Sequence, residues 1–212
     1  MKKKIASLVA ISMLVLSGCN IGQSTEKQLS ETLTKMNESE TEYRDTQSKL
    51  TELEKTEQKT FAETMELTKE DVDKLRTKVG ELEGLLDDRL ANLEKEEAAM
   101  KEAATFVQEL DSIAEKASDS ESEILKLKEA AMKRYTLHSS FIEEYRKLAA
   151  IQKEFYRMLS LEDVELEDLK EKIEEVNGQN AIVKTAIAEF NDATKIVNSL
   201  KEDLFSSLEQ GE

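Results

Sequence analysis

The sequence predicts an all-α protein whose architecture is an elongated up-and-down four-helix bundle. The 212 residues include no proline and only 6 glycines, so few positions are placed to interrupt a helix. Glu, Lys, Leu and Ala dominate the composition, as they do in long amphipathic helices. From Thr25 onward, apolar residues recur at alternating spacings of three and four, which is the period of a helix with one buried face.

The apolar pattern divides into four segments of similar length, which we expect to form the helices 25–67, 69–117, 119–159 and 165–209. At 1.5 Å per residue each would be roughly 65 Å long. The first segment has the loosest pattern, because polar residues occupy several of its inward positions, namely Glu40, Gln47, Glu54 and Glu57. Helices of similar length joined by short turns are typical of an up-and-down bundle.

Short polar motifs mark the predicted turns. Thr68 with Asp71, and Ser118 with Glu121, resemble capping boxes ahead of an apolar run, and 160–165 is the third candidate turn. Asn177-Gly178 predicts a local break in the last helix.

Two other architectures fit the same pattern. The first two segments could continue as one helix through Thr68 to give a three-helix bundle, or the chain could form a coiled-coil rod by parallel dimerisation. Apolar doublets such as Leu85-Leu86 and Phe141-Ile142 make the seams wider than a coiled-coil stripe. This width favours the intramolecular four-helix bundle, while the exact helix breaks near Thr68 and Gly178 stay open.

The first nineteen residues have the pattern of a bacterial lipoprotein signal. Three lysines precede an apolar run, Ile5 to Leu16, that ends in Leu16-Ser17-Gly18-Cys19. A membrane-spanning helix needs roughly 20 apolar residues, and this run is shorter. We therefore expect residues 1–18 to be a signal peptide, Cys19 to carry a diacylglyceryl anchor with acyl chains such as palmitate, 19–24 to be a tether, and 25–212 to form the bundle domain. The expected location is the extracytoplasmic face of the cell membrane.

The charge of the chain excludes one class of partner. Cleavage before Cys19 would remove three of the 30 basic residues and none of the 46 acidic ones, which takes the formal net charge from -16 to -19. Binding to nucleic acid requires clustered Lys and Arg, so we expect no nucleic-acid partner.

The sequence offers no candidate catalytic or metal-binding residues. His138 is the single histidine, which excludes a di-metal helical bundle with its Glu-x-x-His pairs on two helices. Acidic residues are so frequent that no carboxylate pair stands out, and Cys19 is assigned to the lipid. We therefore predict that the protein is not an enzyme and has no cofactor.

The third segment carries a distinctive mixture of arginine and tyrosine. Arg134, Tyr145 and Tyr156 follow one another at a spacing of eleven, which is almost three helical turns, and a second set has the same spacing, namely Tyr135, Arg146 and Arg157. Tyrosine stacks on sugar faces and arginine pairs with carboxylate or phosphate, so these six residues are the candidate surface for a glycan strand or a partner helix. The alternative is that the tyrosines lie at the core edge and the arginine stems cover apolar surface. On the first interpretation, replacing the three arginines together would weaken binding without unfolding the domain.

Several stretches of the third and fourth segments resemble the cell-wall-binding lipoproteins of Gram-positive bacteria, the YkyA-like family. The stretches that carry this resemblance are 131–135 (Ala-Met-Lys-Arg-Tyr), Glu144-Tyr145, 154–156 (Glu-Phe-Tyr), 169–177 (Leu-Lys-Glu-Lys-Ile-Glu-Glu-Val-Asn) and 189–191 (Glu-Phe-Asn). The resemblance implies an up-and-down helical bundle outside the cytoplasmic membrane, wall binding and no assigned enzymatic activity. It supplies no ligand residues, and Asn180 stands where the family pattern has an aromatic residue.

These observations together predict a lipid-anchored, non-catalytic protein with a cell-wall-binding or spacing role. Its expected partners are the membrane through Cys19, and peptidoglycan or a wall-associated protein. One alternative is an adaptor or regulator of a cell-wall hydrolase or of another membrane protein. A second alternative is a carrier with a pocket inside the bundle, suggested by the polar core positions His138, Asn180 and Thr194. The sequence leaves the oligomeric state open.

Overall fold

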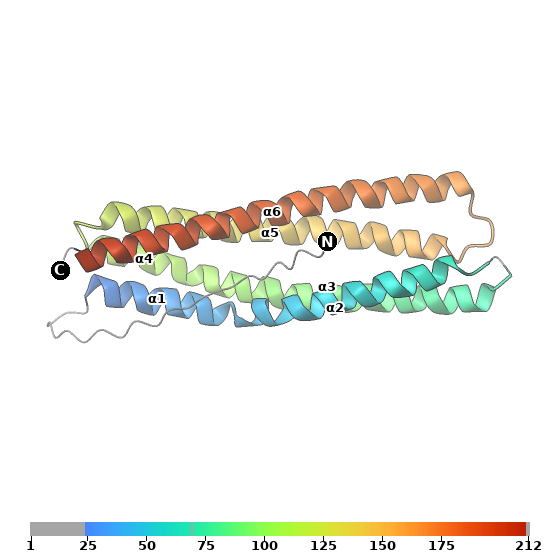
Figure 1. Cartoon of the computed structure of the whole chain (residues 1–212), viewed down its shortest axis with the longest axis horizontal. Helices are drawn as coiled ribbons and strands as arrows, with labels where there is room; N and C mark the ends of the chain where they lie inside the picture. The colour runs from blue at the N-terminus through green and yellow to red at the C-terminus, as the bar shows by residue number, and fades with distance from the viewer. Residues whose placement is uncertain (1–23, 69, 211–212) are drawn as a thin grey trace, which may run out of the picture.

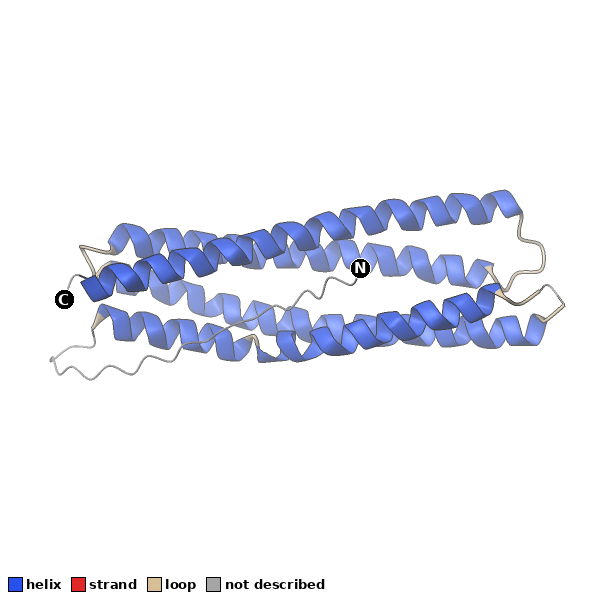
Figure 2. Ribbon diagram, in the orientation of Figure 1, coloured by secondary structure: helices blue, strands red, loops and turns tan. Residues whose placement is uncertain are grey.

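The computed structural model describes residues 24–68 and 70–210, and every secondary-structure element in this part of the chain is a helix (Figure 2). The elements are α1 (Thr25–Ser39), α2 (Thr41–Met65), α3 (Val72–Thr105), the 3₁₀ helix η1 (Phe106–Gln108), α4 (Glu109–Ala114), α5 (Glu121–Met158) and α6 (Leu166–Gln210). The predicted all-α class is confirmed.

The helices form an elongated up-and-down bundle with four long rods (Figure 1). The rods are α1 with α2, α3 with η1 and α4, α5, and α6. The start of α1 and the end of α6 lie at one end of the bundle, which we call the proximal end. The α2–α3 and α5–α6 turns lie at the opposite, distal end. The chain reverses between α2 and α3, so the three-helix alternative is wrong.

The rods pack most closely in three pairs, which are α5 with α6, α2 with α3, and α3 with α5. Helices α2 and α5 are not among the closely packed backbone pairs of the described residues, and they face each other across the interior. Long side chains are therefore needed to connect α2 with α5. This arrangement determines the chemistry of the core, as described below.

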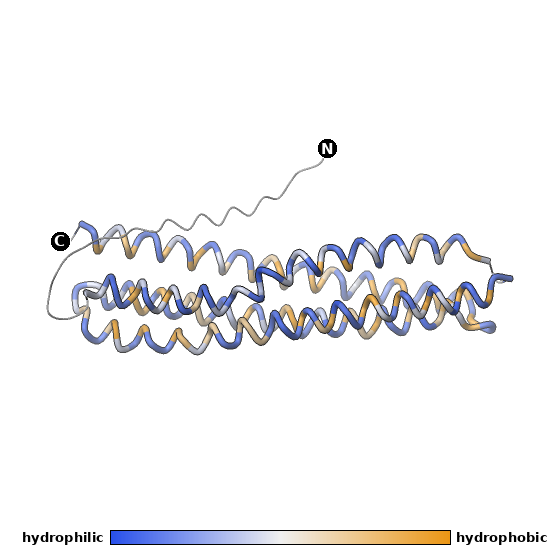
Figure 3. Tube along the Cα trace, turned by 90° about the horizontal axis from the view of Figure 1, so that it is seen from below, coloured by the Kyte–Doolittle hydropathy of each residue, from blue (hydrophilic) through white to orange (hydrophobic). Residues whose placement is uncertain are grey.

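Three apolar clusters follow one another along the bundle. The largest, at the proximal end, joins α1, α3, α4, α5 and α6 through fully buried residues such as Leu29, Leu110 and Leu204. The middle cluster is Leu93, Phe141, Ile142, Tyr145, Leu148 and Val183. The distal cluster is Val79, Leu82, Phe155 and Tyr156, with Phe61 and Leu169 packed against it. Each fully buried leucine contributes about 1.5–3 kcal/mol relative to an exposed one. Figure 3 shows the corresponding pattern, in which hydrophobic positions recur along helices that are otherwise hydrophilic.

Three helix breaks differ from the prediction. The second segment is not a single α-helix, since the 3₁₀ helix η1 separates α3 from α4. The first segment does not continue unbroken to residue 67, because α1 ends at Ser39 and α2 begins at Thr41. Asn177-Gly178 causes no break, since α6 is continuous from Leu166 to Gln210. A Gly inside a helix costs only about 1 kcal/mol relative to Ala, and apolar contacts at Val176 and Val183 hold the helix on both sides.

The predicted turns are confirmed in place, but their capping differs in detail. The Asp71 carboxylate accepts hydrogen bonds from the Thr68 amide (3.2 Å) and hydroxyl (3.0 Å), while Asp71 itself is the N-cap of α3. The helix α5 begins two residues later than the Ser118 capping box implies. Its N-cap is Ser120, which makes no side-chain capping hydrogen bond.

Candidate functional site: the arginines and tyrosines of helix α5

All six residues predicted to form a binding surface lie on α5, but they do not form one exposed stripe. The side chains of Arg146 and Arg157 are 40% and 61% exposed. The other four residues are buried, so the prediction of a binding surface is wrong for Arg134, Tyr135, Tyr145 and Tyr156. The spacing of eleven does place them on one side of the helix, but that side faces the interior. Acidic side chains from other helices make this burial favourable, and three layers of polar contacts result.

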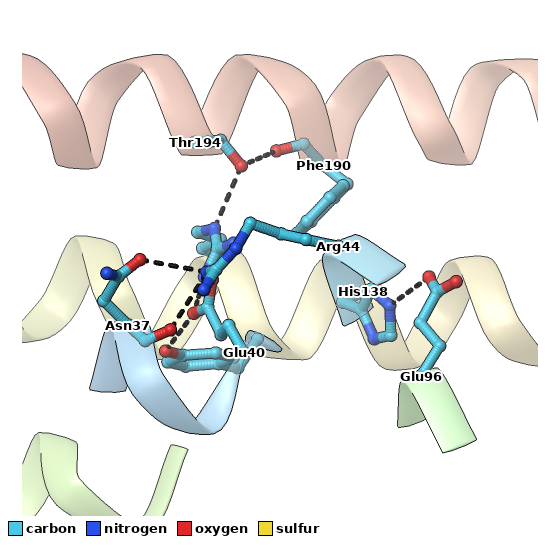
Figure 4. A network of polar contacts seen from close by, with 9 residues as sticks. Asn37, Glu40, Arg44, Glu96, His138, Phe190 and Thr194 are labelled. Carbon is cyan, nitrogen blue, oxygen red and sulfur yellow. Dashed lines mark hydrogen bonds and ion pairs between the residues drawn. The ribbon is translucent and has the colours of Figure 1, made fainter. Parts of the chain in front are cut away.

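The first layer is centred on Glu40, in the short interruption between α1 and α2 (Figure 4). Both oxygens of its carboxylate bind the Arg134 guanidinium, at 2.6 and 2.9 Å, and one of them also accepts a hydrogen bond from the Tyr135 hydroxyl at 2.6 Å. Arg134 Nε donates to Thr194 Oγ1 of α6 at 3.0 Å. This arginine therefore connects α5 with the α1–α2 rod and with α6.

The guanidinium of Arg44 stabilises the interruption at Glu40 from the outside. It donates hydrogen bonds to the carbonyl oxygen (2.9 Å) and to the side-chain oxygen (3.0 Å) of Asn37. Figure 4 shows Asn37, Glu40 and Arg44 together on this turn of the chain. The interruption places the Glu40 carboxylate toward the interior, where it meets Arg134.

The second layer is a buried pair between His138 of α5 and Glu96 of α3. Nε2 of His138 lies 2.8 Å from Glu96 Oε1, and both side chains are 1% exposed (Figure 4). The second oxygen of Glu96 accepts a hydrogen bond from the Gln47 amide at 2.7 Å. The rings of Tyr43, Phe141 and Phe190 surround the imidazole at centroid distances of 5.2 to 6.0 Å, so the core is packed at this level.

The third layer is centred on Arg89 of α3. Its guanidinium binds the buried carboxylate of Glu57 and donates to the Tyr145 hydroxyl, with Nε at 2.7 Å. Tyr156 donates its hydroxyl hydrogen to the other oxygen of Glu57, and Tyr145 donates to Glu54 at 3.2 Å. All the charged groups at the centre of this layer therefore have partners.

Burial and charge together shift the pKa values of these groups. Burial alone would lower the pKa of Arg89, but Tyr145 and Glu57 raise it by more, and the guanidinium stays charged. Arg134 behaves in the same way, with Glu40 as the main group that raises its pKa. Burial also raises the pKa of the phenols, to about 12 for Tyr43 and further for Tyr135, Tyr145 and Tyr156. All four phenols are therefore neutral at physiological pH, and Tyr135, Tyr145 and Tyr156 donate hydrogen bonds to carboxylates.

The two exposed arginines connect α5 with α3 at the bundle surface. Arg146 donates to Glu97 at 2.7 Å and Arg157 donates to Glu83 at 2.6 Å. The hydrogen bond from Arg146 lowers the pKa of the Glu97 carboxyl. Exposed pairs of this kind contribute little to stability, so both arginines can exchange these carboxylates for another anionic partner at low cost.

The sequence placed the polar residues of the first segment on its inward side, but it did not identify their partners on α3 and α5. Glu40, Gln47, Glu54 and Glu57 repeat near the heptad period in the first segment, which places them on its inward side. Arg89 and Glu96 gave no such signal, because they lie beside a seam that apolar residues already fill. Arg89 and Glu96 are buried because α2 and α5 pack against α3 and supply their hydrogen-bond partners.

Two surface hollows on the described residues bear on the carrier alternative. One, of about 390 Å³, is lined by Glu63, Leu67, Asp73, Lys74, Thr77 and Lys78 at the distal end, and the other, of about 330 Å³, lies between α3 and α5. Neither is lined by His138, Asn180 or Thr194, the residues that suggested an internal pocket. Within residues 24–68 and 70–210, no group of three or more His, Cys, Asp or Glu side chains is placed to hold a metal ion.

No helix of the described part of the chain is both long enough and apolar enough to cross a membrane. The predicted signal peptide, Cys19 and most of the predicted tether lie outside the described residues, so the structure does not test them.

Comparison with known families identifies the chain. Residues 24–207 match the YkyA family, described as "Putative cell-wall binding lipoprotein". The chain belongs to the YkyA family. A curated relative, the "Uncharacterized lipoprotein YkyA" of Bacillus subtilis (strain 168), is 30% identical over 208 residues, which cover 96% of this chain and 92% of the relative. The resemblance inferred from α5 and α6 is therefore confirmed.

A solved structure shares the fold. The 1.6 Å crystal structure of a conserved protein of unknown function from Staphylococcus aureus superposes with a TM-score of 0.73, at 20% sequence identity. The match covers 86% of this chain and 96% of that chain. At this level of identity the likeness shows the fold alone, and it supports the elongated four-helix bundle.

Proposed function

We propose that this protein is a lipid-anchored, non-catalytic spacer on the extracytoplasmic face of the membrane, with its bundle extending into the cell wall. The observation that carries the proposal is the position of the bundle relative to the predicted anchor. Helix α1 begins at Thr25, at the proximal end, and Cys19 precedes it by six residues. At about 3.5 Å per extended residue, the tether spans at most roughly 20 Å.

The length of the bundle sets the reach of such a spacer. Helix α6 has 45 residues, which corresponds to roughly 67 Å at 1.5 Å per residue. The distal end can therefore stand several tens of ångströms above the bilayer. The acidic chain is repelled by an anionic membrane surface, which favours an upright orientation over one along the bilayer.

The role proposed for the interior is structural. The buried charges of Glu57 and Arg89, and of Glu40 and Arg134, bind one another across the bundle. These ion pairs hold the rods in place. Because each charged group is already paired with its partner, we assign these groups no catalytic role. The family description favours wall binding as the purpose of the spacer, and the exposed Arg146 and Arg157 are its candidate contacts.

The anchor is tested by replacing the lipid-accepting residue. We expect Cys19→Ser to move the protein from the membrane fraction to the medium, because diacylation is the only feature proposed to hold it at the bilayer. Fractionation of cells followed by immunoblotting measures this change. Membrane retention of the variant at the wild-type level would overturn the anchored part of the proposal.

Wall binding is tested separately with purified residues 20–212. We expect saturable cosedimentation with peptidoglycan sacculi, weakened severalfold by the double replacement Arg146→Ala and Arg157→Ala. The matched control is Lys147→Ala with Lys153→Ala, which removes the same charge from neighbouring positions of α5. Equal loss in both variants would mean general charge attraction, and absence of cosedimentation at two salt concentrations would restrict the function to spacing.

A further inference from the structure

The distal end of the bundle exposes a concentration of large apolar side chains. Met65, at the end of α2, is 56% exposed. Leu161, in the α5–α6 turn, is 57% exposed, and Leu166, the first residue of α6, is 67% exposed. Ile173, two turns into α6, is 41% exposed. Both turns lie at the same end of the bundle, opposite the start of α1 (Figure 1).

These exposed residues continue outward from the distal core cluster. Phe61, Leu159 and Leu169 pack against that cluster. Met65 lies one helical turn beyond Phe61, Leu161 follows Leu159 by two residues, and Leu166 precedes Leu169 by three. Each of the four exposed residues therefore lies within four residues of a side chain that packs against the distal cluster, and we call the four the distal platform.

Carboxylates flank Leu161 and Leu166 on this surface. Five exposed acidic residues and no basic residue lie between Leu161 and Leu169, namely Glu162, Asp163, Glu165, Glu167 and Asp168. Glu162 pairs with Arg76 at 3.5 Å and Glu167 with Lys170 at 3.3 Å, in both cases at exposed sites. Within the described part of the chain, the other three carboxylates have no ion-pair partner within 4.0 Å. An apolar surface with an acidic rim complements a segment that has apolar and basic side chains together.

We propose that this distal platform, formed by Met65, Leu161, Leu166 and Ile173 within the acidic rim 162–168, docks a basic amphipathic segment of a partner protein. The apolar side chains of the segment would cover the leucines, and its Lys or Arg side chains would pair with the rim. The inference rests on the proposed spacer function and deepens it, since it assigns what the spacer holds. The lipid fixes one end of the rod, and the other end carries the partner.

The same charges disfavour the other occupants of an exposed apolar surface. Anionic lipid and anionic wall polymer would meet carboxylates, and like charges in contact cost energy. A second copy of this chain would bring an identical acidic rim against the first. A basic protein segment is the partner that gains from both the apolar and the charged parts.

Site-specific photocrosslinking in the anchored, full-length protein tests this proposal. The photoreactive residue p-benzoylphenylalanine is introduced at Leu166, and at Ile182 as a control. Ile182 is also on α6 and is 49% exposed, but it lies away from the distal end. We expect a discrete protein adduct from position 166, at least tenfold stronger than from position 182, whose crosslinked peptide carries apolar and basic residues on opposite faces of a helix.

A second set of variants tests the charge. Glu162→Gln, Asp163→Asn and Glu165→Gln together should reduce the adduct from position 166 by at least fivefold, because they remove three of the five rim carboxylates. The control Glu189→Gln with Asp192→Asn neutralises exposed acids of α6 away from the distal end and should leave the adduct unchanged.

Four results would overturn the proposal. These are equal adducts at both positions, an adduct with lipid, glycan or a second copy, an adduct insensitive to the rim, and no adduct from correctly anchored and folded protein. Circular dichroism of purified variants checks folding. The Cys19→Ser fractionation does not involve the distal end, so failure of the docking proposal and failure of the anchored spacer are separate outcomes.

Discussion

Replacing Arg89 by methionine tests whether the interior charges stabilise the bundle only as pairs. The arginine side chain is 6% exposed and Glu57, its main partner, is 5% exposed. The Arg89 guanidinium also lies over the Tyr145 ring, with Cζ 5.0 Å from the centroid. Methionine preserves most of the buried volume, so the substitution removes the charge and the hydrogen bonds with little loss of packing.

The expected cost follows from what the substitution leaves behind. Removing one partner of a buried ion pair destabilises a protein by about 3–5 kcal/mol, because the remaining charge is uncompensated. Glu57 keeps the hydrogen bond from Tyr156, so we expect the lower part of this range, about 3 kcal/mol. For a domain of this size that corresponds to a fall in Tm of roughly 6–12 °C. The double variant Arg89→Met with Glu57→Met should recover at least half of the loss, because no charge is then left unpaired.

Urea unfolding at pH 7, followed by circular dichroism at 222 nm, measures the free energy of unfolding of each variant. The matched control is Arg157→Met, which removes an arginine from the same end of the bundle at an exposed ion pair with Glu83. That change should cost less than about 1 kcal/mol. Equal losses for Arg89→Met and Arg157→Met would refute the reasoning, because the buried pair would then contribute no more than a surface pair.

Three further predictions follow from the same structure. Gly178→Ala should stabilise the protein by about 0.5–1 kcal/mol in thermal unfolding, because α6 is helical there and a Cβ would meet no atom within 4 Å; a loss would mean that the helix breaks at this point. Stability should fall steeply from about pH 10 upward. The unfolded chain ionises its tyrosines near pH 10, whereas burial holds the pKa of Tyr43 at about 12 and those of Tyr135, Tyr145 and Tyr156 higher, so the stability present below pH 10 is lost as the pH rises, by about 1.4 kcal/mol per tyrosine and pH unit. Tyrosinate absorbance and helix loss should then change together, and free titration near pH 10 with the helices intact would contradict this. Finally, Arg134→Met should destabilise the domain by about 3 kcal/mol in urea, whereas Arg146→Ala should change its stability by less than about 1 kcal/mol. The triple arginine replacement, which the sequence predicts to weaken binding without unfolding the domain, should therefore also lower its stability. Equal effects of the two single substitutions would contradict the burial of Arg134.

The periodicity of the sequence was sufficient to predict the rods and the turns, since both depend on local patterns. The alternating spacing of three and four places Leu82, Leu86 and Leu93 in the core of α3, where they are fully buried. The Asn177-Gly178 signal was wrong, because a single glycine is too weak to end a helix that has apolar contacts on both sides. The interruption at Glu40 was missed because the carboxylate it turns inward pairs with Arg134, which is 94 residues later in the chain and has no local signal.

The candidate site was harder to predict, because the same arginine and tyrosine spacing suits an exposed stripe and a buried one. Whether the stripe is exposed or buried depends on which residues the helix that faces α5 supplies. For Arg134 and Tyr145 that helix belongs to the α1–α2 rod, nearly 100 residues earlier in the chain, and it supplies Glu40 and Glu54. A single sequence contains both sets of residues, but it does not give the axial alignment that brings them together.

The buried charges themselves select that alignment. The α1–α2 rod and α5 run in the same direction, and Glu40 meets Arg134 while Glu54 meets Tyr145. If the α1–α2 rod moved by one heptad along α5, the apolar seams would stay in contact. Leu33 or Gln47 would then lie opposite Arg134 in place of the Glu40 carboxylate. An unpaired buried arginine costs several kcal/mol, and the shifted arrangement would also leave Glu40 or Glu57 without its partner. Apolar side chains alone would tolerate such a shift. The paired charges therefore fix one axial alignment of the helices, and with it one length of the bundle and one arrangement of its distal end.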